Sequence, residues 1–215
     1  MGELEDTRRS YDLVADRYSA ELSGELAGKP LDRALLVALA ELAGGGCIVD
    51  VGAGPGHVTA HLASCGTAAI GLDLSPGMCA VGHRDTGLPF AAADMVGLPL
   101  SSGAVTGIVC FYALIHLDTP GRASAYREFS RVLGRGGYAL VAFHTSDAEV
   151  PVGGERARKD WWGYEVDLVF RFLDPATEVK SMAEVGLELV ARMDRGPHPD
   201  VEHLSQRSYL LVRRH

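Results

Sequence analysis

Short apolar runs alternate with helical patterns through the middle of the chain. The runs contain branched residues and lack a polar alternation, which is typical of strands covered on both faces. Strand and helix in close alternation predict parallel strands joined by crossover helices. The predicted strands are 47–52, 68–73, 88–94, 105–112 and 138–144, and the predicted helices are 56–66, 75–84 and 119–137.

Two helical patterns precede this alternation. Tyr11, Val14, Ala15, Tyr18 and Leu22 recur at helical spacing and predict one amphipathic helix. The stretch 29–46 predicts a second helix with Pro30 in its first turn. Its core-facing stripe is expected to be Leu31, Leu35, Leu39 and Leu42. Ser75 and Thr119 are expected to cap the later helices that begin beside them.

The regular pattern stops after His144. The segment 145–173 holds both tryptophans of the chain, and a long excursion of this kind in a compact domain is often functional. A helix from Asp174 to Val185 and strands at 187–193 and 208–214 are expected to close the fold. We therefore predict a single α/β domain, doubly wound, over 1–215. It would have about seven strands, an N-terminal helical cap at 1–43 and a lid at 145–173.

Composition narrows the location and the partners. The chain has 215 residues, is 47% hydrophobic and carries a net charge of −8. An acidic surface repels phosphate backbones, so we expect no binding of nucleic acid. Cys47, Cys65, Cys79 and Cys110 form no CxxC pair and are expected to be buried free thiols, which suits a reducing cytoplasm. The charged N-terminus predicts no signal peptide, and the longest uncharged stretch is too short to span a bilayer.

A glycine-rich turn follows the first strand, in "VDVGAGPGHVTAHL". Gly52, Gly54 and Gly56 are spaced GxGxG, whereas the dinucleotide fingerprint is GxGxxG. The phosphate loop of nucleotide triphosphatases needs a lysine that is absent from this turn. Taken alone, the glycines also fit a tight turn that binds no ligand.

Three carboxylates surround this turn at the predicted sheet edge. Asp73 ends the second strand and is placed to accept hydrogen bonds from two ribose hydroxyls. Asp94 ends the third strand and is placed to accept from an exocyclic amine, and Asp50 directly precedes the glycines. Such a set suits a ligand with cationic groups better than a diphosphate.

These stretches resemble a known family. "VDVGAGPGHVTAHL", "GLDLSPGM", "AADMVGLPL" and "FYALIHL…EFSRVLGRGGYALVAF" are similar to the class I S-adenosylmethionine-dependent methyltransferases, most closely the small-molecule branch. The resemblance covers roughly residues 10–143. It implies a Rossmann-like, mostly parallel seven-stranded sheet with an antiparallel last strand, and S-adenosylmethionine as cofactor. One departure is Thr106–Gly107, where the family usually has an acidic residue.

The resemblance also implies a cofactor site. Tyr11 and Tyr18 would close over the cofactor, although a core stripe explains them equally well. Asp94 with Met95 would flank the adenine, and Asp50 would hold the methionyl ammonium or brace the loop. The expected cofactor residues are Tyr11, Tyr18, Asp50, Gly52, Ala53, Gly54, Gly56, Asp73, Leu74, Met78, Asp94, Met95 and Phe111.

An acceptor site is expected beside the methyl group. His116 follows the fourth strand, where a neutral imidazole could take a proton from the acceptor; a pocket-lining role is the equal alternative. The expected acceptor residues are Tyr18, His116, His144, Trp161, Trp162 and Phe170, with an ordinary hydrophobic cluster as the alternative for the aromatic ones. His57 and His61 have the i, i+4 spacing of metal ligands but no evident third ligand, so a surface helix and no metal are expected.

These observations predict a methyltransferase that acts on an O, N or C atom of a small molecule in biosynthesis. Two alternatives stay open, a nicotinamide-dependent (NAD(P)) oxidoreductase and a catalytically silent, cofactor-binding regulatory protein. The expected partner is a small-molecule acceptor, with no nucleic acid and no membrane, and the expected assembly is a monomer or a homodimer.

Overall fold

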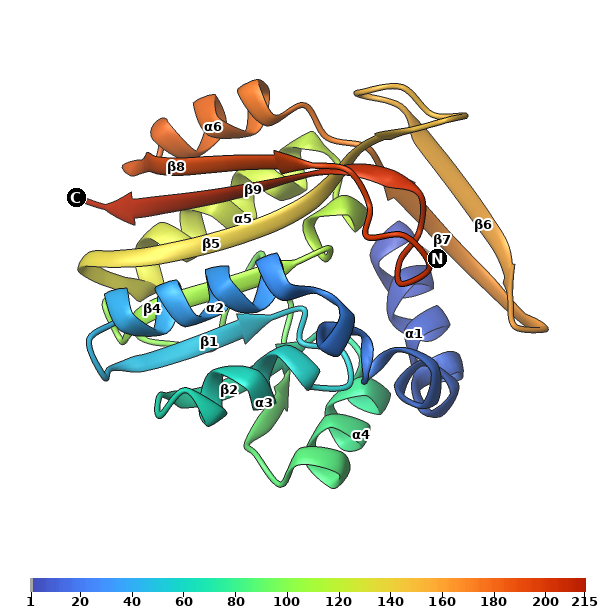
Figure 1. Cartoon of the computed structure of the whole chain (residues 1–215), viewed down its shortest axis with the longest axis horizontal. Helices are drawn as coiled ribbons and strands as arrows, with labels where there is room; N and C mark the ends of the chain where they lie inside the picture. Colours follow the sequence, from blue (N-terminus) through green and yellow to red (C-terminus); the bar gives the residue numbers. More distant parts are fainter. Residues whose placement is uncertain (1) are drawn as a thin grey trace.

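A seven-stranded sheet forms the centre of the molecule, in a computed structural model that describes residues 2–215 (Figure 1). The strand order is β3-β2-β1-β4-β5-β9-β8. The first five strands are parallel, and β9 runs antiparallel to both of its neighbours. This confirms the predicted Rossmann-like fold class. The strands are β1 Cys47–Val51, β2 Ala68–Asp73, β3 Phe90–Ala92, β4 Val105–Phe111, β5 Leu133–Asp147, β8 Leu187–Arg195 and β9 Ser205–Arg214.

Helices cover both faces of this sheet. Ile48 of β1 packs with helices α2 and α3, while its neighbour Val49 packs with α5 and α6 on the other face. Both side chains are fully buried, which explains the apolar run without polar alternation. The helices are α1 Glu3–Leu22, α2 Pro30–Leu42, α3 His57–Ser64, α4 Pro76–Thr86, α5 Thr119–Val132 and α6 Pro175–Ala183, with 3-10 turns η1 Glu25–Gly28 and η2 Leu114–His116.

Of the two caps that the sequence predicted, Ser75 is confirmed and Thr119 is not. The Ser75 hydroxyl accepts from the Met78 N–H at 3.0 Å, as predicted. Asp174 caps α6 through the N–H groups of Ala176 and Thr177. The prediction for Thr119 was wrong, because Asp118 caps α5 by accepting from the Gly121 N–H at 2.8 Å.

The predicted stripe of α2 was also partly wrong. Leu31 and Leu42 are 43% and 42% exposed, whereas Leu36 is fully buried. The helix turns its Asp32 face inward because Arg195 and Tyr209 bind that carboxylate from β8 and β9. The buried ion pair between Asp32 and Arg195 thus sets which face of α2 points inward, and this face differs from the one that the leucine pattern predicted.

The long excursion forms an antiparallel hairpin, β6 Glu155–Trp161 and β7 Tyr164–Arg171, separate from the main sheet. It lies beside α1 at one end of the molecule (Figure 1). Val166 and Leu168 of β7 pack with Val14 and Ala15 of α1. Helix α1, at the start of the chain, is therefore packed against β7, which directly precedes the last helix, α6.

The cysteine prediction holds for two of four thiols. Cys79 and Cys110 are buried, but Cys65 is exposed at the end of α3 and Cys47 is half-buried at a strand start. All four are free thiols. Within the described residues, every helix is too short or too polar to cross a bilayer.

Candidate functional site

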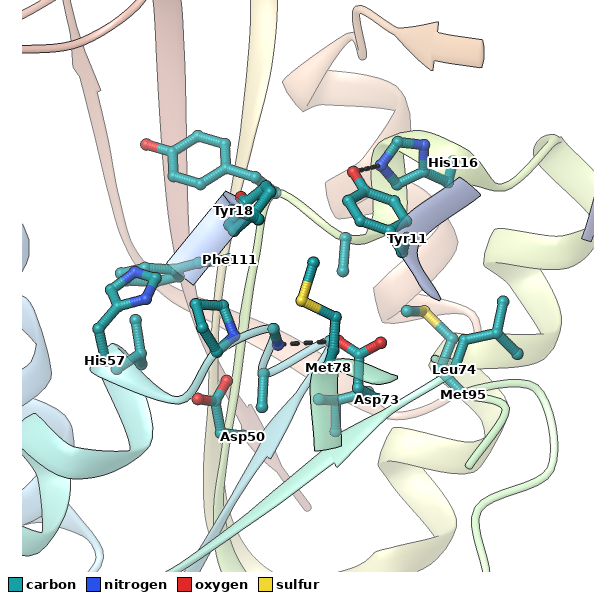
Figure 2. Close-up of a pocket in the computed structure, with 18 of the residues that line it drawn as sticks. Tyr11, Tyr18, Asp50, His57, Asp73, Leu74, Met78, Met95, Phe111 and His116 are labelled. Carbon is teal, nitrogen blue, oxygen red and sulfur yellow. Dashed lines mark hydrogen bonds between the residues drawn. The ribbon is translucent and has the colours of Figure 1, made fainter. Parts of the chain in front are cut away.

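A cavity lies at the carboxyl ends of β1, β2 and β4, where ligands of open parallel sheets bind. Figure 2 shows Asp50 and Asp73 on one side and Tyr11 and Tyr18 on the other. Every predicted cofactor residue except Gly56 lines it. These residues are Tyr11, Tyr18, Asp50, Gly52, Ala53, Gly54, Asp73, Leu74, Met78, Asp94, Met95 and Phe111.

The three glycines of the turn have different roles. All have positive φ, which favours glycine. A Cβ on Gly52 would lie 2.2 Å from the Ala113 Cβ, while a Cβ on Gly54 would enter open space. Gly54 therefore forms a cradle that a side chain would partly fill. Gly56 does not line the cavity, because it is the N-cap of α3, where a Cβ would lie 2.5 Å from the Phe90 ring; its predicted contact with the cofactor therefore has no support from the cavity lining.

Asp73 is held rigidly at the end of β2. One carboxylate oxygen accepts from the Gly54 N–H at 2.8 Å and the other from the Ser75 N–H at 2.8 Å. Burial raises the pKa of Asp73 to about 6, against those two hydrogen bonds, which lower it. Each oxygen keeps a second lone pair for a ligand. The fixed geometry suits a pair of neighbouring hydroxyls.

The other two carboxylates are also anchored. Asp50 is buried and accepts from the Thr59 hydroxyl of α3 at 2.7 Å. Burial raises the pKa of Asp50 to about 6. Asp94 accepts from the Val96 N–H at 3.0 Å, which turns the chain so that Met95 also faces the cavity. Asp50 thus braces the start of α3 and also lines the cavity, and its contact with the methionyl ammonium stays a prediction.

Helix α1 covers the cavity, and Asp12 fastens it there. The Asp12 carboxylate accepts from the Ser75 hydroxyl at 2.6 Å and from the Gly77 N–H at 2.8 Å. This contact holds Tyr11 over the turn that carries Asp73. Sequence reasoning missed Asp12, although its place next to Tyr11 on a predicted helix facing the sheet edge was a usable signal.

His116 lines this cavity, but its acceptor nitrogen is already engaged. Its Nδ1 lies 2.9 Å from the Val169 carbonyl, so Nδ1 carries the proton and donates. Its Nε2 lies 2.8 Å from the Tyr11 hydroxyl and accepts from it. Burial lowers the pKa of His116 to about 4, so the ring is neutral. A proton from a ligand would reach His116 through Tyr11.

A second cavity adjoins the first between η1, the hairpin and the β8–β9 loop. Tyr11, Tyr18 and Tyr112 line both. Four of the predicted acceptor residues line the second cavity together with Tyr18: His144, Trp161, Trp162 and Phe170. His116 is the exception, since it lines only the first.

The tryptophans form an aromatic wall. The rings of Trp161 and Trp162 stack with centroids 4.8 Å apart, and Tyr18 meets both edge-on. Trp162 has φ +55° in a two-residue hairpin turn, a position that usually takes asparagine or glycine. A bulky residue held in this conformation is a feature of binding sites.

Tyr112 and His144 form a second aromatic wall of this cavity. Their rings stack at 4.8 Å, and Tyr112 also has positive φ, at +58°. Burial and the charge of Arg207 lower the pKa of His144 to about 3, so it is neutral. Its Nδ1 lies 2.8 Å from the Ser205 hydroxyl. Tyr112 was missed as a site residue, although it is the last residue of the predicted strand 105–112, which ends beside the glycine turn.

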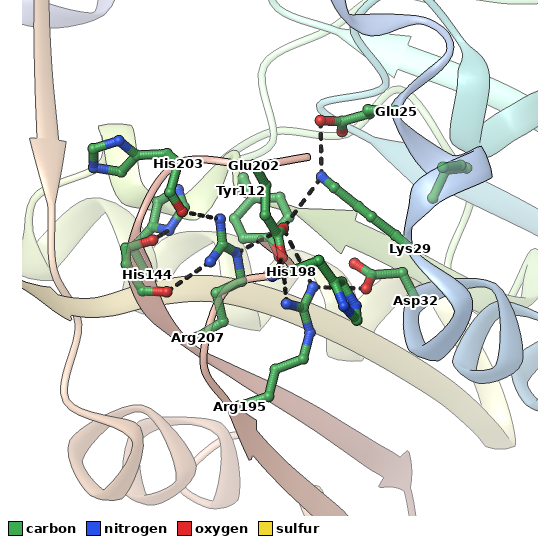
Figure 3. A network of polar contacts seen from close by, with 12 residues as sticks. Glu25, Lys29, Asp32, Tyr112, His144, Arg195, His198, Glu202, His203 and Arg207 are labelled. Atoms are coloured by element: carbon green, nitrogen blue, oxygen red, sulfur yellow. Dashed lines mark hydrogen bonds and ion pairs between the residues drawn. The ribbon is translucent and has the colours of Figure 1, made fainter. Parts of the chain in front are cut away.

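A buried ionic network supports this wall (Figure 3). Glu202, whose side chain is 2% exposed, pairs with Lys29 at 3.5 Å and Arg207 at 3.1 Å, and also pairs with Arg195. Arg195 in turn pairs with Asp32 at 2.7 Å. The network ties the β8–β9 loop to α2, and Lys29 and Glu202 face the second cavity.

The histidines of α3 differ from the prediction. His57 is not on an open surface, because its side chain is 13% exposed, faces Glu25 at 3.3 Å and lines the first cavity. The Nε2 of His61 is buried as well. Residues 2–215 contain no group of three metal-binding side chains.

Comparison with known proteins matches part of the chain to a methyltransferase domain. Residues 48–137 match the family model for a methyltransferase domain. A demethylmenaquinone methyltransferase from Beutenbergia cavernae is 31% identical over 142 residues, which cover 66% of this chain and 56% of that protein. Residues 48–137 thus form a methyltransferase domain, and the fold is that of the class I S-adenosylmethionine-dependent methyltransferases.

Solved methyltransferases share the whole architecture. The geranyl diphosphate C-methyltransferase of Streptomyces coelicolor aligns with a TM-score of 0.69 at 16% identity, covering 100% of this chain and 99% of that one. The magnesium protoporphyrin IX methyltransferase of Synechocystis aligns with a TM-score of 0.71 at 16% identity, covering 100% and 98%. Both likenesses concern the fold.

The methyltransferase domain also accounts for the cofactor. This family uses S-adenosylmethionine as methyl donor, and the Synechocystis structure holds it. The match therefore disfavours the nicotinamide alternative. The chain spans about half the length of the curated relatives it matches, with 56% and 44% for the first two.

Proposed function

We propose that this chain transfers a methyl group from S-adenosylmethionine to a small-molecule acceptor of a biosynthetic pathway. The observation that carries the proposal is the junction of two cavities. The first has the anchored Asp73 carboxylate and the open Gly54 cradle, the second has aromatic walls, and Tyr11, Tyr18 and Tyr112 line both. The cofactor, when bound, supplies a methyl group that its sulfonium already activates.

The residues of the first cavity fit that cofactor. Asp73 would accept hydrogen bonds from the two ribose hydroxyls. Asp94 would accept from the adenine amine, with Met95 against the ring. Asp50 and the turn at Gly52 and Gly54 would hold the methionyl end, where the acidic side chain favours an ammonium group. Among residues 2–215, no arginine lines this cavity, and the lysine that does, Lys29, is already paired with Glu25 and Glu202, so the lining does not favour a diphosphate.

The second cavity would hold the acceptor and shield it from water. Aromatic side chains exclude water and leave the acceptor oriented toward the shared wall, which is the main requirement of a transfer from an activated methyl donor. An acceptor hydroxyl or amine would give its proton to the Tyr11 hydroxyl as Tyr11 gives its own to His116 Nε2. This route places Tyr11 at the acceptor and His116 behind it.

Small acceptors are consistent with the relatives. The aligned structures carry the names of enzymes for geranyl diphosphate and magnesium protoporphyrin IX, and the curated relative is named for demethylmenaquinone. These molecules have large apolar parts. We expect an acceptor with an apolar body here as well, methylated on O, N or C.

Two measurements test the proposal. Calorimetry should show binding of S-adenosylmethionine and of its demethylated product, and no binding of NAD. Incubation with a labelled methyl donor and a library of small aromatic and prenylated acceptors should yield a methylated product. Binding without transfer to any acceptor would favour a regulatory protein, and failure to bind the methyl donor would exclude the proposed function.

A further inference from the structure

The second cavity contains three arginines, and two of them are neutralised by the protein. Arg207 pairs with Glu202 and donates to the carbonyls of Ser205 and His203. Arg156 pairs with Asp147 at 2.9 Å and with Glu149 at 3.0 Å. Both guanidinium groups are thus committed to holding the walls of the cavity.

Arg158 differs from both. Among residues 2–215, no carboxylate lies within ion-pair distance of its guanidinium, and the group donates no hydrogen bond. It lies over the Trp161 ring at 5.0 Å and over the Phe170 ring at 5.7 Å. Stacking of this kind fixes the plane of the guanidinium and leaves its edge donors available.

The position of Arg158 directs it into the cavity. It lies on the inward face of β6 with Arg156, whereas Lys159 lies on the exposed face and pairs with Asp167. The charge of Arg158 also reaches the Tyr11 hydroxyl, where it opposes the larger effect of burial in raising the pKa of that tyrosine. The Trp161 ring therefore lies next to both the free cation and the Tyr11 ring, at 5.0 Å and 6.1 Å, and all three residues line the same cavity.

We propose that Arg158 binds an anionic group, a carboxylate or a phosphate, on an acceptor whose body is planar and apolar. A guanidinium edge matches both anions with two parallel hydrogen bonds. The stacked rings of Trp161 and Trp162 match a flat body, and the partly desolvated setting strengthens the charge pairing. This inference rests on the proposed function and names the chemical class of its acceptor.

Competing charges do not cancel this cation. Glu25 is bound by Lys29 at 2.8 Å and by His57, and Glu202 is bound by two arginines and Lys29. Asp200 also lines the cavity, but it is exposed on the β8–β9 loop. The positive charge of Arg158 is therefore left for an anion that comes from outside the protein.

The test compares four ligands of one shape: 2-naphthoate, 2-naphthyl phosphate, the neutral 2-naphthamide and 2-naphthylmethylammonium. Binding to the full chain saturated with S-adenosylhomocysteine is followed by calorimetry. We expect at least one of the two anions to bind about tenfold or more tightly than the amide, and the ammonium to bind most weakly. The ratio between carboxylate and phosphate identifies which anion the site prefers.

Matched variants show whether Arg158 causes the preference. Arg158→Gln should bring the affinities for anion and amide within about twofold of each other. Lys159→Gln removes the same charge from the opposite face of the strand and should leave the preference unchanged. Thermal unfolding of both variants checks their folding.

The outcomes separate this inference from the function on which it rests. Equal binding of anions and amide, binding of none of the four ligands, or an anion preference that survives Arg158→Gln would each overturn the proposal. The affinity for S-adenosylhomocysteine is measured in the same experiments. Its loss would contradict the methyltransferase function, whereas normal affinity without an anion preference would contradict only the role of Arg158.

Discussion

The Tyr11 hydroxyl lies 2.8 Å from His116 Nε2, and this contact joins the covering helix α1 to the turn that follows β4. Because His116 Nδ1 donates to the Val169 carbonyl at 2.9 Å, the imidazole has only one direction in which to accept a proton. The pair therefore has the arrangement of a relay, with the tyrosine facing the ligand and the histidine behind it.

Tyr11→Phe should lower turnover strongly if the acceptor loses a proton during methyl transfer. A positioned proton acceptor contributes about 10²–10⁴-fold, and the variant removes the group that would pass the proton. The affinity for S-adenosylhomocysteine should change by no more than about threefold, since the ring stays in place. Labelled-methyl transfer under single-turnover conditions measures the first effect and calorimetry the second.

His116→Gln is the matched control for this relay. Glutamine has an oxygen that can accept from Tyr11 but cannot take up its proton at neutral pH. Turnover as low as in Tyr11→Phe would indicate proton transfer to His116. Turnover within about threefold of the parent would show that His116 only positions Tyr11.

The pH dependence of turnover should lack a limb near the ordinary histidine value. Burial lowers the pKa of His116 from 6.5 to about 4, so the ring is a neutral acceptor down to the acid range. With S-adenosylmethionine kept saturating at every pH, turnover limited by this group should be flat from pH 8 to about pH 5 and fall as the pH approaches 4. A bell centred near pH 6.5 would show that another group controls the proton.

The same shift has a consequence for stability. Between pH 6.5 and about 4, the unfolded chain binds more protons at His116 than the folded chain does. The stabilisation is complete above pH 6.5 and is lost as the pH falls through this range. In His116→Gln the slope of unfolding free energy against pH should be smaller there, as denaturant titrations at several pH values would show.

Asp73→Ala should remove most of the cofactor affinity. Two charge-assisted hydrogen bonds to a ribose contribute about 1.5–3 kcal/mol each, so the Kd for S-adenosylmethionine should rise by about a hundredfold or more. The control is Asp16→Ala, which should leave the Kd unchanged. Asp16 is an exposed carboxylate of α1 that pairs with Arg84 of α4. An unchanged Kd in Asp73→Ala would remove the ribose assignment.

Cofactor binding should also weaken in acid. Burial raises the pKa of Asp73 from 3.8 to about 6, and the protonated carboxyl is a poorer acceptor for ribose hydroxyls. Affinity should therefore be full above pH 7 and fall as the pH drops through about 6. Calorimetry between pH 5 and pH 8 measures this, and a Kd that is constant over the range would contradict the role of an ionised Asp73.

Asp12→Ala should release α1 from the turn that follows β2. The substitution removes the acceptor for the Ser75 hydroxyl and the Gly77 N–H. Hydrogen exchange in residues 3–22 should become faster, and cofactor dissociation should speed up by about tenfold because the cover opens more often. Asp12→Asn keeps one acceptor oxygen and should lie between the parent and the alanine variant. Unchanged exchange in both variants would show that apolar packing alone holds α1.

Glu202→Ala should destabilise the fold by about 3–5 kcal/mol, because it leaves three buried cations without their shared carboxylate. Burial raises the pKa of Glu202, but the hydrogen bond from Arg195 and the nearby cations outweigh this and lower it to about 2. The stabilisation is present above pH 4.5 and is lost as the pH falls toward 2. Denaturant unfolding at pH 7 and pH 3 should show a smaller difference between variant and parent at the lower pH.

The sequence by itself determined the sheet and the glycine turn. Parallel strands buried on both faces leave an unbroken apolar signal, and the turn between β1 and α3 needs residues that tolerate positive φ. Asp73 and Asp94 could be predicted because each is the carboxylate at or just beyond a strand end, and strand ends of a parallel sheet share one edge. These features depend on residues close together in the chain.

Only the tertiary structure decided how the distant segments meet. Asp12 reaches a turn more than sixty residues away, His116 receives Tyr11 across 105 residues, and Asp32 turns α2 by meeting Arg195 across 163. No periodicity in the chain encodes such pairings, because each depends on the packing of elements whose order in space differs from their order in sequence. The placement of Gly56 against Phe90, and of Arg158 over Trp161 and Phe170, followed from the same packing.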